Sequence, residues 1–404
     1  ASITHPSVIR AVIDYVYIAL EGRGRIVVAD APQMDCSWDK LAAAVRIDAI
    51  QDFYRKRFGF AIEVYDLRNF ELIDARQPAF SSNRRSRPGD PAGSVLVNLG
   101  RKSAFYGLPS ENYYGADYDR RETIARHHDE THEYSVSRTV LDADVFISLP
   151  KMKVHKKVGV TLNLKGLVGI NTNKNCLVHY RLGSPSQGGD QLPDASAAYD
   201  ATLIRGQRKL FDVLLARQNR FADAAYIILR AAYRTFIKPF RPISNEARTL
   251  DAGNWHGNDS AWRMTADLAA VIHFAGSDGS LTAAPHRRFL SVVDGIIGGD
   301  REGPLAPTAR PAGMLVSGEN LLAVDLVTAR LMGFDPRLIK TFSIMRSNQW
   351  NFGVPDFQSL EILFAGSCID PATFFSADWS CRVTPFTPHP GWLGHLEMKP
   401  ETAP

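Results

Sequence analysis

Five lysines and one histidine gather in residues 149–170, directly after a predicted strand that ends at Pro150. Ligands of open α/β sheets bind at the carboxyl ends of strands, so these side chains lie where a site is expected. Ammonium groups attract a phosphate or carboxylate, and their mutual repulsion lowers the pKa of a lysine toward that of a useful base. The alternative is a solvated basic loop. The segment holds Lys151, Lys153, His155, Lys156, Lys157 and Lys165, with Gly159, Gly166 and Gly169 to let backbone amides approach an anion.

A second polar segment, residues 173–194, places His179, Tyr180, Arg181 and Asp190 among glycines. Long loops of this composition are more often sites than structural turns. The expected catalytic residues of the two segments are His155, Lys165, His179 and Asp190. The expected substrate-binding residues are Lys151, Lys153, Asn171 and Arg181.

Residues 254–268 add Asp259 and Arg263 to the expected substrate-binding residues. If a helix begins near Asp259, then Asp259, Arg263 and Asp267 share one face, and an ion pair of structural character explains them at least as well. Asn258 and Asp259 also suit the first position of a helix.

Two further motifs concern metal ions. Asp294 ends a predicted strand before a glycine-rich turn, and with His179 it is a candidate metal ligand. His128 and His132 have the spacing of a helical metal pair, but the segment lacks the HEXXH motif. We favour a solvated polar connection for this pair of histidines.

The elements around these motifs alternate between helices and short apolar strands, which predicts an α/β fold of mostly parallel sheets flanked by helices. Helices are expected at residues 4–20, 37–58 and 323–333. Strands are expected at 25–30, 61–67, 94–100 and 142–150, and a strand at 289–299 runs into a glycine turn. We expect two lobes, residues 1–200 and 281–404, separated by a mainly helical insertion at 201–280.

The insertion contains a helical stretch, residues 201–243, that is apolar on one side and rich in arginine on the other. One interpretation is a helical pair that caps the sheet. The alternative is a surface that rests on an anionic membrane through residues 221–243. Its membrane-facing residues would be Tyr226, Ile227, Ile228, Tyr233, Phe236 and Phe240 beside Arg230, Arg234, Lys238 and Arg241.

Composition excludes several classes of protein. Of 404 residues, 45% are hydrophobic and 22% are charged, and the net charge of +4 is too weak to indicate nucleic-acid binding. The four cysteines are scattered without a CxxC pair, which argues against a zinc ribbon and an iron–sulfur cluster. No apolar stretch is long enough to span a membrane, and the start shows no signal peptide. We expect a cytoplasmic protein, and an opening helix without a preceding strand suggests a truncated start.

The segment PKMKVHKKVGVTLNLKGLVGI resembles the signature of a bacterial and archaeal family known as domain of unknown function 362. The later VVDGIIGGDREGPLAPTARPAGMLVSGENLLAVDLVTARLMGFDP is similar to that family's C-terminal signature. HYRLGSPSQGGD and NWHGNDSAWRM resemble its larger members, which are often encoded near genes for cell-surface polysaccharides. The chain departs from the family in lacking the opening strand with its Lys-Pro-Asn step. It also lacks the ferredoxin-like cysteine cluster of many relatives, which removes electron transfer as a competing function.

The spacing of His155, Lys165 and His179 is also distantly similar to a constellation in nickel-pincer lactate racemases. That resemblance implies Lys165 as the tether of the cofactor, His155 as an acid/base group, and His179 as a nickel ligand or acid/base group. The cofactor is therefore left open between none, a divalent metal and a nickel-pincer group.

Together these features predict an enzyme that acts on a small anionic sugar or hydroxy acid by acid/base chemistry, as an epimerase, isomerase or lyase. A role in cell-surface polysaccharide synthesis follows from the resemblance. The competing hypothesis is a non-catalytic anion-binding or scaffold protein of an envelope-assembly pathway, with contact to the inner membrane.

Overall fold

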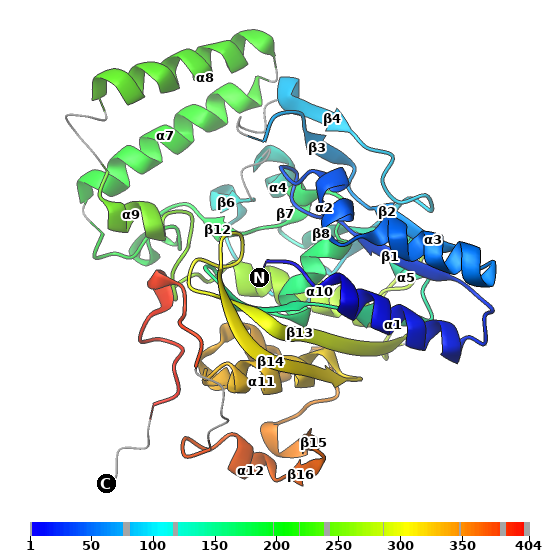
Figure 1. The fold of residues 1–404 in the computed structure, drawn as a ribbon. Coiled ribbons are helices and arrows are strands. Elements are labelled where there is room, and N and C mark those ends of the chain that lie inside the picture. The colour runs from blue at the N-terminus through cyan, green and yellow to red at the C-terminus, as the bar shows by residue number, and fades with distance from the viewer. Residues whose placement is uncertain are drawn as a thin grey trace.

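The computed structural model describes residues 2–75, 81–115, 120–196, 198–217, 219–237, 243–285, 287–346, 349–379 and 385–399. Helices lie on both sides of a central sheet, and the N-terminal helices and strands pack beside it (Figure 1). The α/β class expected from the sequence is confirmed. The buried residues of the main core run from Ala31 to Leu396, across the lobe boundaries expected at residues 200 and 280.

The N-terminal unit has its own small core, in which two helices cover a pair of parallel strands. The strands are β1 (Ile26–Asp30) and β2 (Ile62–Asp66), and the first helix is α1 (Pro6–Ala19). The helix expected at 37–58 is divided into α2 (Trp38–Ala44) and α3 (Ile47–Phe58). Arg46 causes the break because its left-handed φ of 53° cannot continue a helix.

The central sheet is built around the long strand β13 (Arg288–Asp300). β9 (Val145–Ser148) and β10 (Lys151–His155) both run parallel to β13, one along its first part and the other along its second. β14 (Thr308–Gly318) and β11 (Gly159–Thr161) add antiparallel pairs at the two edges. The basic segment after Pro150 is therefore a sheet strand, which excludes the alternative of a solvated basic loop.

The glycine turn expected near residue 299 is also corrected, because β13 continues through its glycines to Asp300. These glycines permit close packing rather than a turn. A Cβ on Gly295 would lie 2.6 Å from Cε of Met152, and one on Gly298 would lie 2.6 Å from the ring of Phe386. The strand therefore needs glycine wherever β10 and the C-terminal segment approach it.

The expected polar connection with His128 and His132 is a β-hairpin instead of a helix or a solvated loop. β7 (His127–His128) pairs with β8 (Thr131–Ser137), which also pairs with β5 (Ser94–Asn98). His127 and His132 face each other in the register and are buried. The i, i+4 spacing thus arises from a tight hairpin, and a helical metal pair is excluded here.

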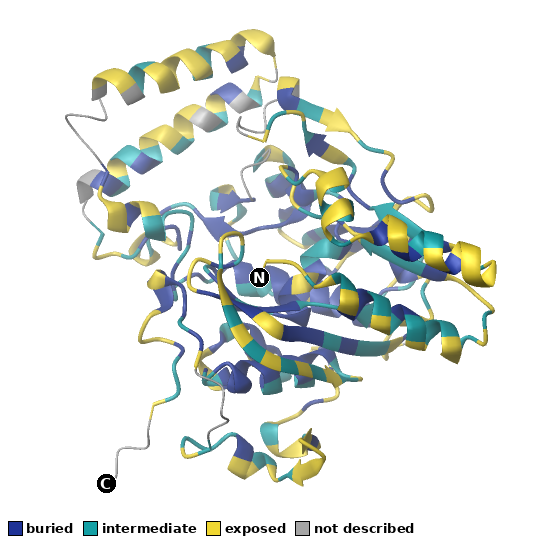
Figure 2. Cartoon of the chain, viewed as in Figure 1, coloured by how far each residue is buried: buried dark blue, intermediate teal, exposed yellow. Residues whose placement is uncertain are grey.

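Two helices lie in the core and two project from it. α10 (Ala261–Phe274) and α11 (Leu321–Leu331) are almost entirely buried. α7 (Ala198–Ala216) and α8 (Arg220–Ala232) form a hairpin that projects from the body, and its outer face is exposed (Figure 2). In the part of the chain that the structure describes, no helix is long and apolar enough to cross a membrane.

The remaining elements are short. Strand pairs are formed by β3 (Phe70–Leu72) with β4 (Arg84–Ser86), β6 (Tyr113–Tyr114) with β12 (Tyr180–Arg181), and β15 (Ile362–Phe364) with β16 (Ser367–Ile369). The short helices are α4 (Arg120–Arg126), α5 (Arg138–Leu141), α6 (Asn163–Gly166), α9 (Asn245–Leu250) and α12 (Pro371–Phe374).

Candidate active site

The side chains of β10 alternate between the core and a basic face. Met152 and Val154 have no exposed surface and pack in the main core. Since successive residues of a strand point to opposite sides, Lys151, Lys153 and His155 share the other face. The strand therefore presents one histidine and two lysines in a row.

Two lysines of this face already have partners. Nζ of Lys151 lies 2.6 Å from Oδ2 of Asp294, and both side chains are buried. Nζ of Lys153 donates to the carbonyl of Ser2 at 2.5 Å, and burial lowers the pKa of Lys153 to about 8. The contacts of Lys151 indicate a structural salt bridge, whereas the sequence suggested a substrate ligand.

Lys165 lies on α6, and a buried carboxylate fixes the start of that helix. Asp325, on α11, accepts hydrogen bonds from the backbone amides of Asn163 and Leu164 at 2.8 and 2.9 Å, and from the Asn163 side chain. In the described structure, Nζ of Lys165 has neither a carboxylate partner nor a hydrogen bond. Burial, reinforced by Lys153, lowers the pKa of Lys165 to about 7.

His155 and His179 are held in opposite tautomers. Nδ1 of His155 accepts from the backbone amide of Lys157 at 2.9 Å, so the neutral ring carries its proton on Nε2. Nδ1 of His179 lies 3.1 Å from the carbonyl of Leu177, which can only accept, so Nε2 of His179 keeps its lone pair. Among the described residues neither Nε2 atom has a hydrogen-bond partner.

The electrostatics tie the two histidines to Lys165. Burial lowers the pKa of both rings well below its ordinary value, and the charge of Lys165 is the second cause in each case. His179 also lowers the pKa of His155. Both rings are consequently neutral at pH 7, one as a proton donor and the other as an acceptor. The structure thus brings together His155, Lys165 and His179.

Two members of this cluster were not predicted as site residues. Lys174 donates to the carbonyls of Val168 and Asn171 at 2.7 and 2.9 Å, and burial lowers its pKa to about 7 while Asp30 opposes that shift. Asp30 is the last residue of β1 and is exposed to solvent. Desolvation by the surrounding protein raises the pKa of its carboxyl group, and the charge of Lys174 opposes that shift. The position of Asp30 at a strand end was a usable sequence signal, whereas nothing distinguished Lys174.

A second network holds the other predicted residues apart from this cluster. Oδ1 of Asp190 accepts from the amide of Arg181 at 2.6 Å, and Oδ2 accepts from the amide of Asp259 and the hydroxyl of Ser260. Arg181 and Arg263 each lie 3.0 Å from Oδ2 of Asp259. Asp190 therefore links its own loop to β12 and to the start of α10, and these contacts indicate a structural rather than a catalytic role.

Asn171 is completely buried and, among the described residues, neither polar atom of its side-chain amide has a partner. Its backbone carbonyl accepts from Lys174, so it lies at the edge of the basic cluster. An unsatisfied buried amide is costly, and it is consistent with the expected contact to a ligand.

The two proposed metal ligands are engaged separately. The carboxylate of Asp294 accepts hydrogen bonds from Nζ of Lys151, from the amide of His5 at 2.8 Å and from the amide of Ile296. Across the described ranges no group of three or more His, Cys, Asp or Glu side chains could hold a metal ion. A metal held by protein side chains alone therefore does not fit the described residues, and no step below uses one.

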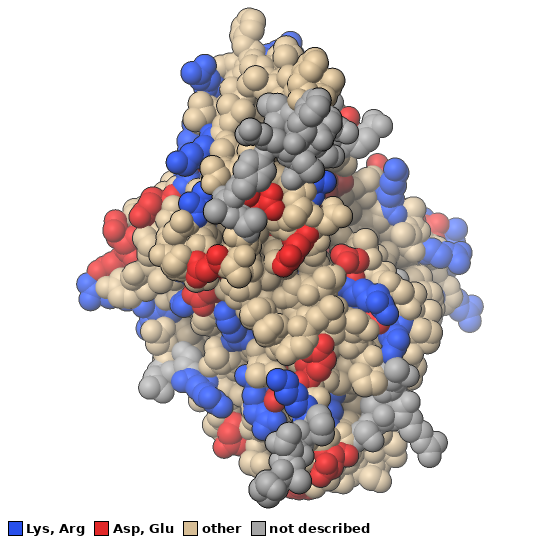
Figure 3. All heavy atoms as spheres, turned by 90° about the vertical axis from the view of Figure 1, so that its left-hand side faces the viewer, with Lys and Arg blue, Asp and Glu red and all other residues tan. Residues whose placement is uncertain are grey.

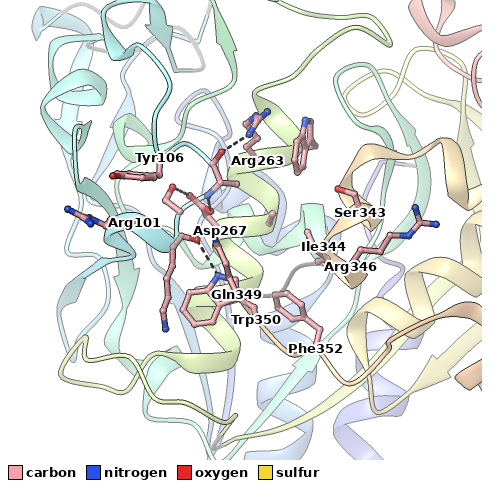
Figure 4. Close-up of a pocket in the computed structure, with 15 residues that line it drawn as sticks. Arg101, Tyr106, Arg263, Asp267, Ser343, Ile344, Arg346, Gln349, Trp350 and Phe352 are labelled. Atoms are coloured by element: carbon pink, nitrogen blue, oxygen red, sulfur yellow. Dashed lines mark hydrogen bonds between the residues drawn. The ribbon is translucent and has the colours of Figure 1, made fainter.

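A cavity of about 470 Å³ lies elsewhere, between α10 and the segment around Trp350 (Figure 4). Arg263 and Asp267 line it, but His155, Lys165 and His179 do not. Arg263 is paired with Asp259, and Asp267 accepts hydrogen bonds from Ser103, Ala104 and Tyr134. Lys102 and Arg346 also line the cavity and supply cations. Because Asp267 is already engaged and no described histidine lines the cavity, it lacks the free acid and base that His155 and His179 supply.

Residues 71–330 match the family model described as "Domain of unknown function (DUF362)". The chain belongs to the DUF362 family. The DUF362 match includes His155, Lys165, Lys174 and His179, and Asp30 lies before it. Comparison with curated proteins and with solved structures found no match. The similarity to lactate racemases is not shown by these comparisons, and it remains a sequence-based expectation.

Proposed function

We propose that this DUF362 protein is a cytoplasmic enzyme that moves a proton on a small anionic substrate, a sugar acid or a hydroxy acid. The observation that carries the proposal is the pair of neutral histidines in opposite tautomers, beside a lysine without a counter-charge. An isomerase, epimerase or lyase needs this combination of acid, base and cation. The resemblance to members encoded near polysaccharide genes suggests cell-surface polysaccharide synthesis as the setting.

In the proposed reaction, Nε2 of His179 removes a proton from the carbon next to a carboxylate or carbonyl. The electron pair of that C–H bond moves onto the oxygen, where the ammonium of Lys165 stabilises the negative charge. Nε2–H of His155 then returns a proton to the carbon, or to a leaving hydroxyl as the electron pair on the oxygen moves back to form a double bond and the C–O bond breaks. The proton that His179 has taken passes through solvent to His155, so both rings are neutral again. The first outcome is epimerisation or isomerisation, and the second releases water and forms a double bond.

Lys165 and Lys174 make the site attractive to an anion. Each ammonium group titrates near pH 7, because the protein interior disfavours its charge. A bound carboxylate or phosphate restores a counter-charge, so binding should protonate these lysines and become tighter as the pH falls toward 6. The same property would serve a non-catalytic anion-binding protein, which is the second candidate.

Hydrogen–deuterium exchange separates the two candidates without knowledge of the product. The protein is incubated in D₂O with a panel of hydroxy acids and sugar acids, and loss of the C–H signal is followed by NMR. We expect exchange on at least one compound, and a loss of at least a hundredfold in His179→Asn. The control is His128→Asn, which changes a partly exposed histidine outside the site.

Binding of the same panel is measured by calorimetry. If Lys165→Met abolishes binding while no compound exchanges deuterium, the protein is a non-catalytic anion binder. If exchange occurs but the double variant His155→Asn/His179→Asn retains it, these histidines are not the acid and base.

A further inference from the structure

The α7–α8 hairpin has an apolar outer surface that no other described part of the chain covers. Phe221 is 89% exposed, Ile228 is 66% exposed and Val213 is 55% exposed. Soluble proteins rarely expose a contiguous apolar patch of this kind, and such patches mark contact with a protein or a membrane. This outer surface is what we call the hairpin face.

The apolar residues follow the helical repeat. Phe221, Ala224, Ile228 and Ala231 occur at intervals of three and four residues on α8, and all are exposed. Residues at this spacing lie along one side of a helix. The opposite side of α8 holds Ala222 and Asp223, which are buried against the body. The helix is therefore amphipathic, with its apolar side directed outward.

The charges of the hairpin differ in exposure, since its carboxylates are engaged by the protein and its fully exposed charges are basic. Residues 198–232 contain six lysines and arginines but three carboxylates, Asp200, Asp212 and Asp223. All three carboxylates are held by the protein: Asp200 by the amide of Ser244, Asp212 by Tyr114, and Asp223 by Ser82. The exposed charges are basic, at Lys209, Arg217, Arg220 and Arg230. The hairpin face thus combines apolar side chains with positive charge alone.

We propose that the hairpin face docks on the surface of an anionic lipid bilayer. An amphipathic helix with basic residues beside its apolar side lies in the plane of such a surface, its aromatic and aliphatic side chains among the headgroups and acyl chains. The hairpin projects from the body, and basic side chains border a mainly uncharged surface at its end (Figure 3). A projecting convex face suits a flat bilayer.

The expected membrane-contact segment, residues 221–243, is described only in part. Ile227, Ile228, Phe236 and Arg230 are exposed, as the membrane hypothesis requires, whereas Tyr226 and Tyr233 are half-buried. Residues Lys238, Phe240 and Arg241, and the side chain of Arg234, lie outside the described part. The proposal therefore rests on α7, α8 and Phe236, and it is independent of the proposed catalytic function.

Flotation with lipid vesicles tests the proposal on the full chain. We expect the protein to float with vesicles that contain 30% phosphatidylglycerol, and to stay at the bottom with vesicles of phosphatidylcholine alone. Phe221→Asp/Ile228→Asp should abolish flotation, because two carboxylates oppose insertion. Arg220→Gln/Arg230→Gln should weaken binding about thirtyfold, at about fivefold for each charge.

The matched control is Tyr15→Asp/Ile18→Asp, which places two carboxylates on exposed positions of α1 and should leave flotation unchanged. Absence of flotation with the anionic vesicles overturns the proposal, as does equal flotation of the two aspartate pairs. Light scattering supplies a further check. If the chain forms a dimer that Phe221→Asp/Ile228→Asp dissociates, the hairpin face is a protein interface instead.

Discussion

Lys165 has a buried ammonium group that meets no carboxylate in the described structure. The protein tolerates it because the pKa of Lys165 falls to about 7, so that much of the charge is absent at neutral pH. A group of this kind destabilises the fold when protonated. Retention of such a lysine is characteristic of a functional position.

The pH dependence of stability should reveal this lysine. An unfolded lysine stays protonated up to its ordinary pKa of 10.5, whereas folded Lys165 loses its proton near pH 7. Between these values the unfolded chain binds more protons, so the free energy of unfolding rises with pH, by about 1.4 kcal/mol per unit from one group. Lys165→Met should reduce the slope by about that amount between pH 7 and 10, as measured by urea unfolding.

The matched control is Lys56→Met, which removes an exposed lysine on α3 and should leave the slope unchanged. Lys153 and Lys174 have depressed pKa values as well, so part of the slope remains in Lys165→Met. A variant with the slope of the parent chain would show that Lys165 is protonated throughout this range.

At the scale of elements, the site depends on where short segments end. β9 and β10 pair one after the other along the same edge of β13, and Leu149 and Pro150 separate the two strands. The 3-10 helix at Leu167–Ile170 then returns the chain to the end of β1, where the amide of Ala31 donates to the carbonyl of Gly169 at 2.7 Å. Asp30 reaches the basic cluster because Gly169 has no side chain.

Gly169→Ala tests this close approach. A Cβ at residue 169 would lie 2.3 Å from Oδ1 of Asp30, so the carboxylate or the backbone must move. Because Oδ1 is the end of a flexible side chain, we expect the carboxylate to turn away and the free energy of unfolding to fall by only about 1 kcal/mol, the low end of the cost of overpacking. Gly166→Ala is the control, because a Cβ there has no atom within 4 Å. Equal effects of the two substitutions would contradict the proposed packing.

At the scale of the molecule, a buried salt bridge links the N-terminal unit to the central sheet. Asp294 accepts from Lys151 on the neighbouring strand and from the amide of His5, just before α1. The hydroxyl of Thr4 also donates to the carbonyl of Leu149 at 2.6 Å. The N-terminal segment is therefore tied to the middle of the sheet, beside the basic face of β10.

Asp294→Asn should destabilise the whole fold. The substitution leaves the Lys151 ammonium buried without a counter-charge, which costs about 3–5 kcal/mol of unfolding free energy. Lys151→Met/Asp294→Asn should recover most of this loss, because no unpaired charge remains. Urea unfolding of the single and double variants measures both effects, and a double variant as unstable as Asp294→Asn would rule out the salt bridge as the cause.

The sequence determined the features that depend on local pattern. Helical spacing predicted α1 and α11, and short apolar runs predicted β1, β2, β5 and β9, because periodicity records which side of an element is buried. The family resemblance identified the segment that carries His155, Lys165 and His179. The distant similarity to lactate racemases grouped these three residues in the sequence, and the electrostatics of the structure couple them.

Tertiary structure alone decided the rest. The tautomers of the histidines depend on the Lys157 amide and the Leu177 carbonyl, and the engagement of Lys151 depends on a strand 143 residues away. The basic segment looked like a loop because β10 is held in the sheet by pairing with β13, a strand far along the chain that no local pattern reveals. Asp190 looked catalytic because a buried structural carboxylate and a reactive one have the same sequence signal, and only their hydrogen bonds distinguish them.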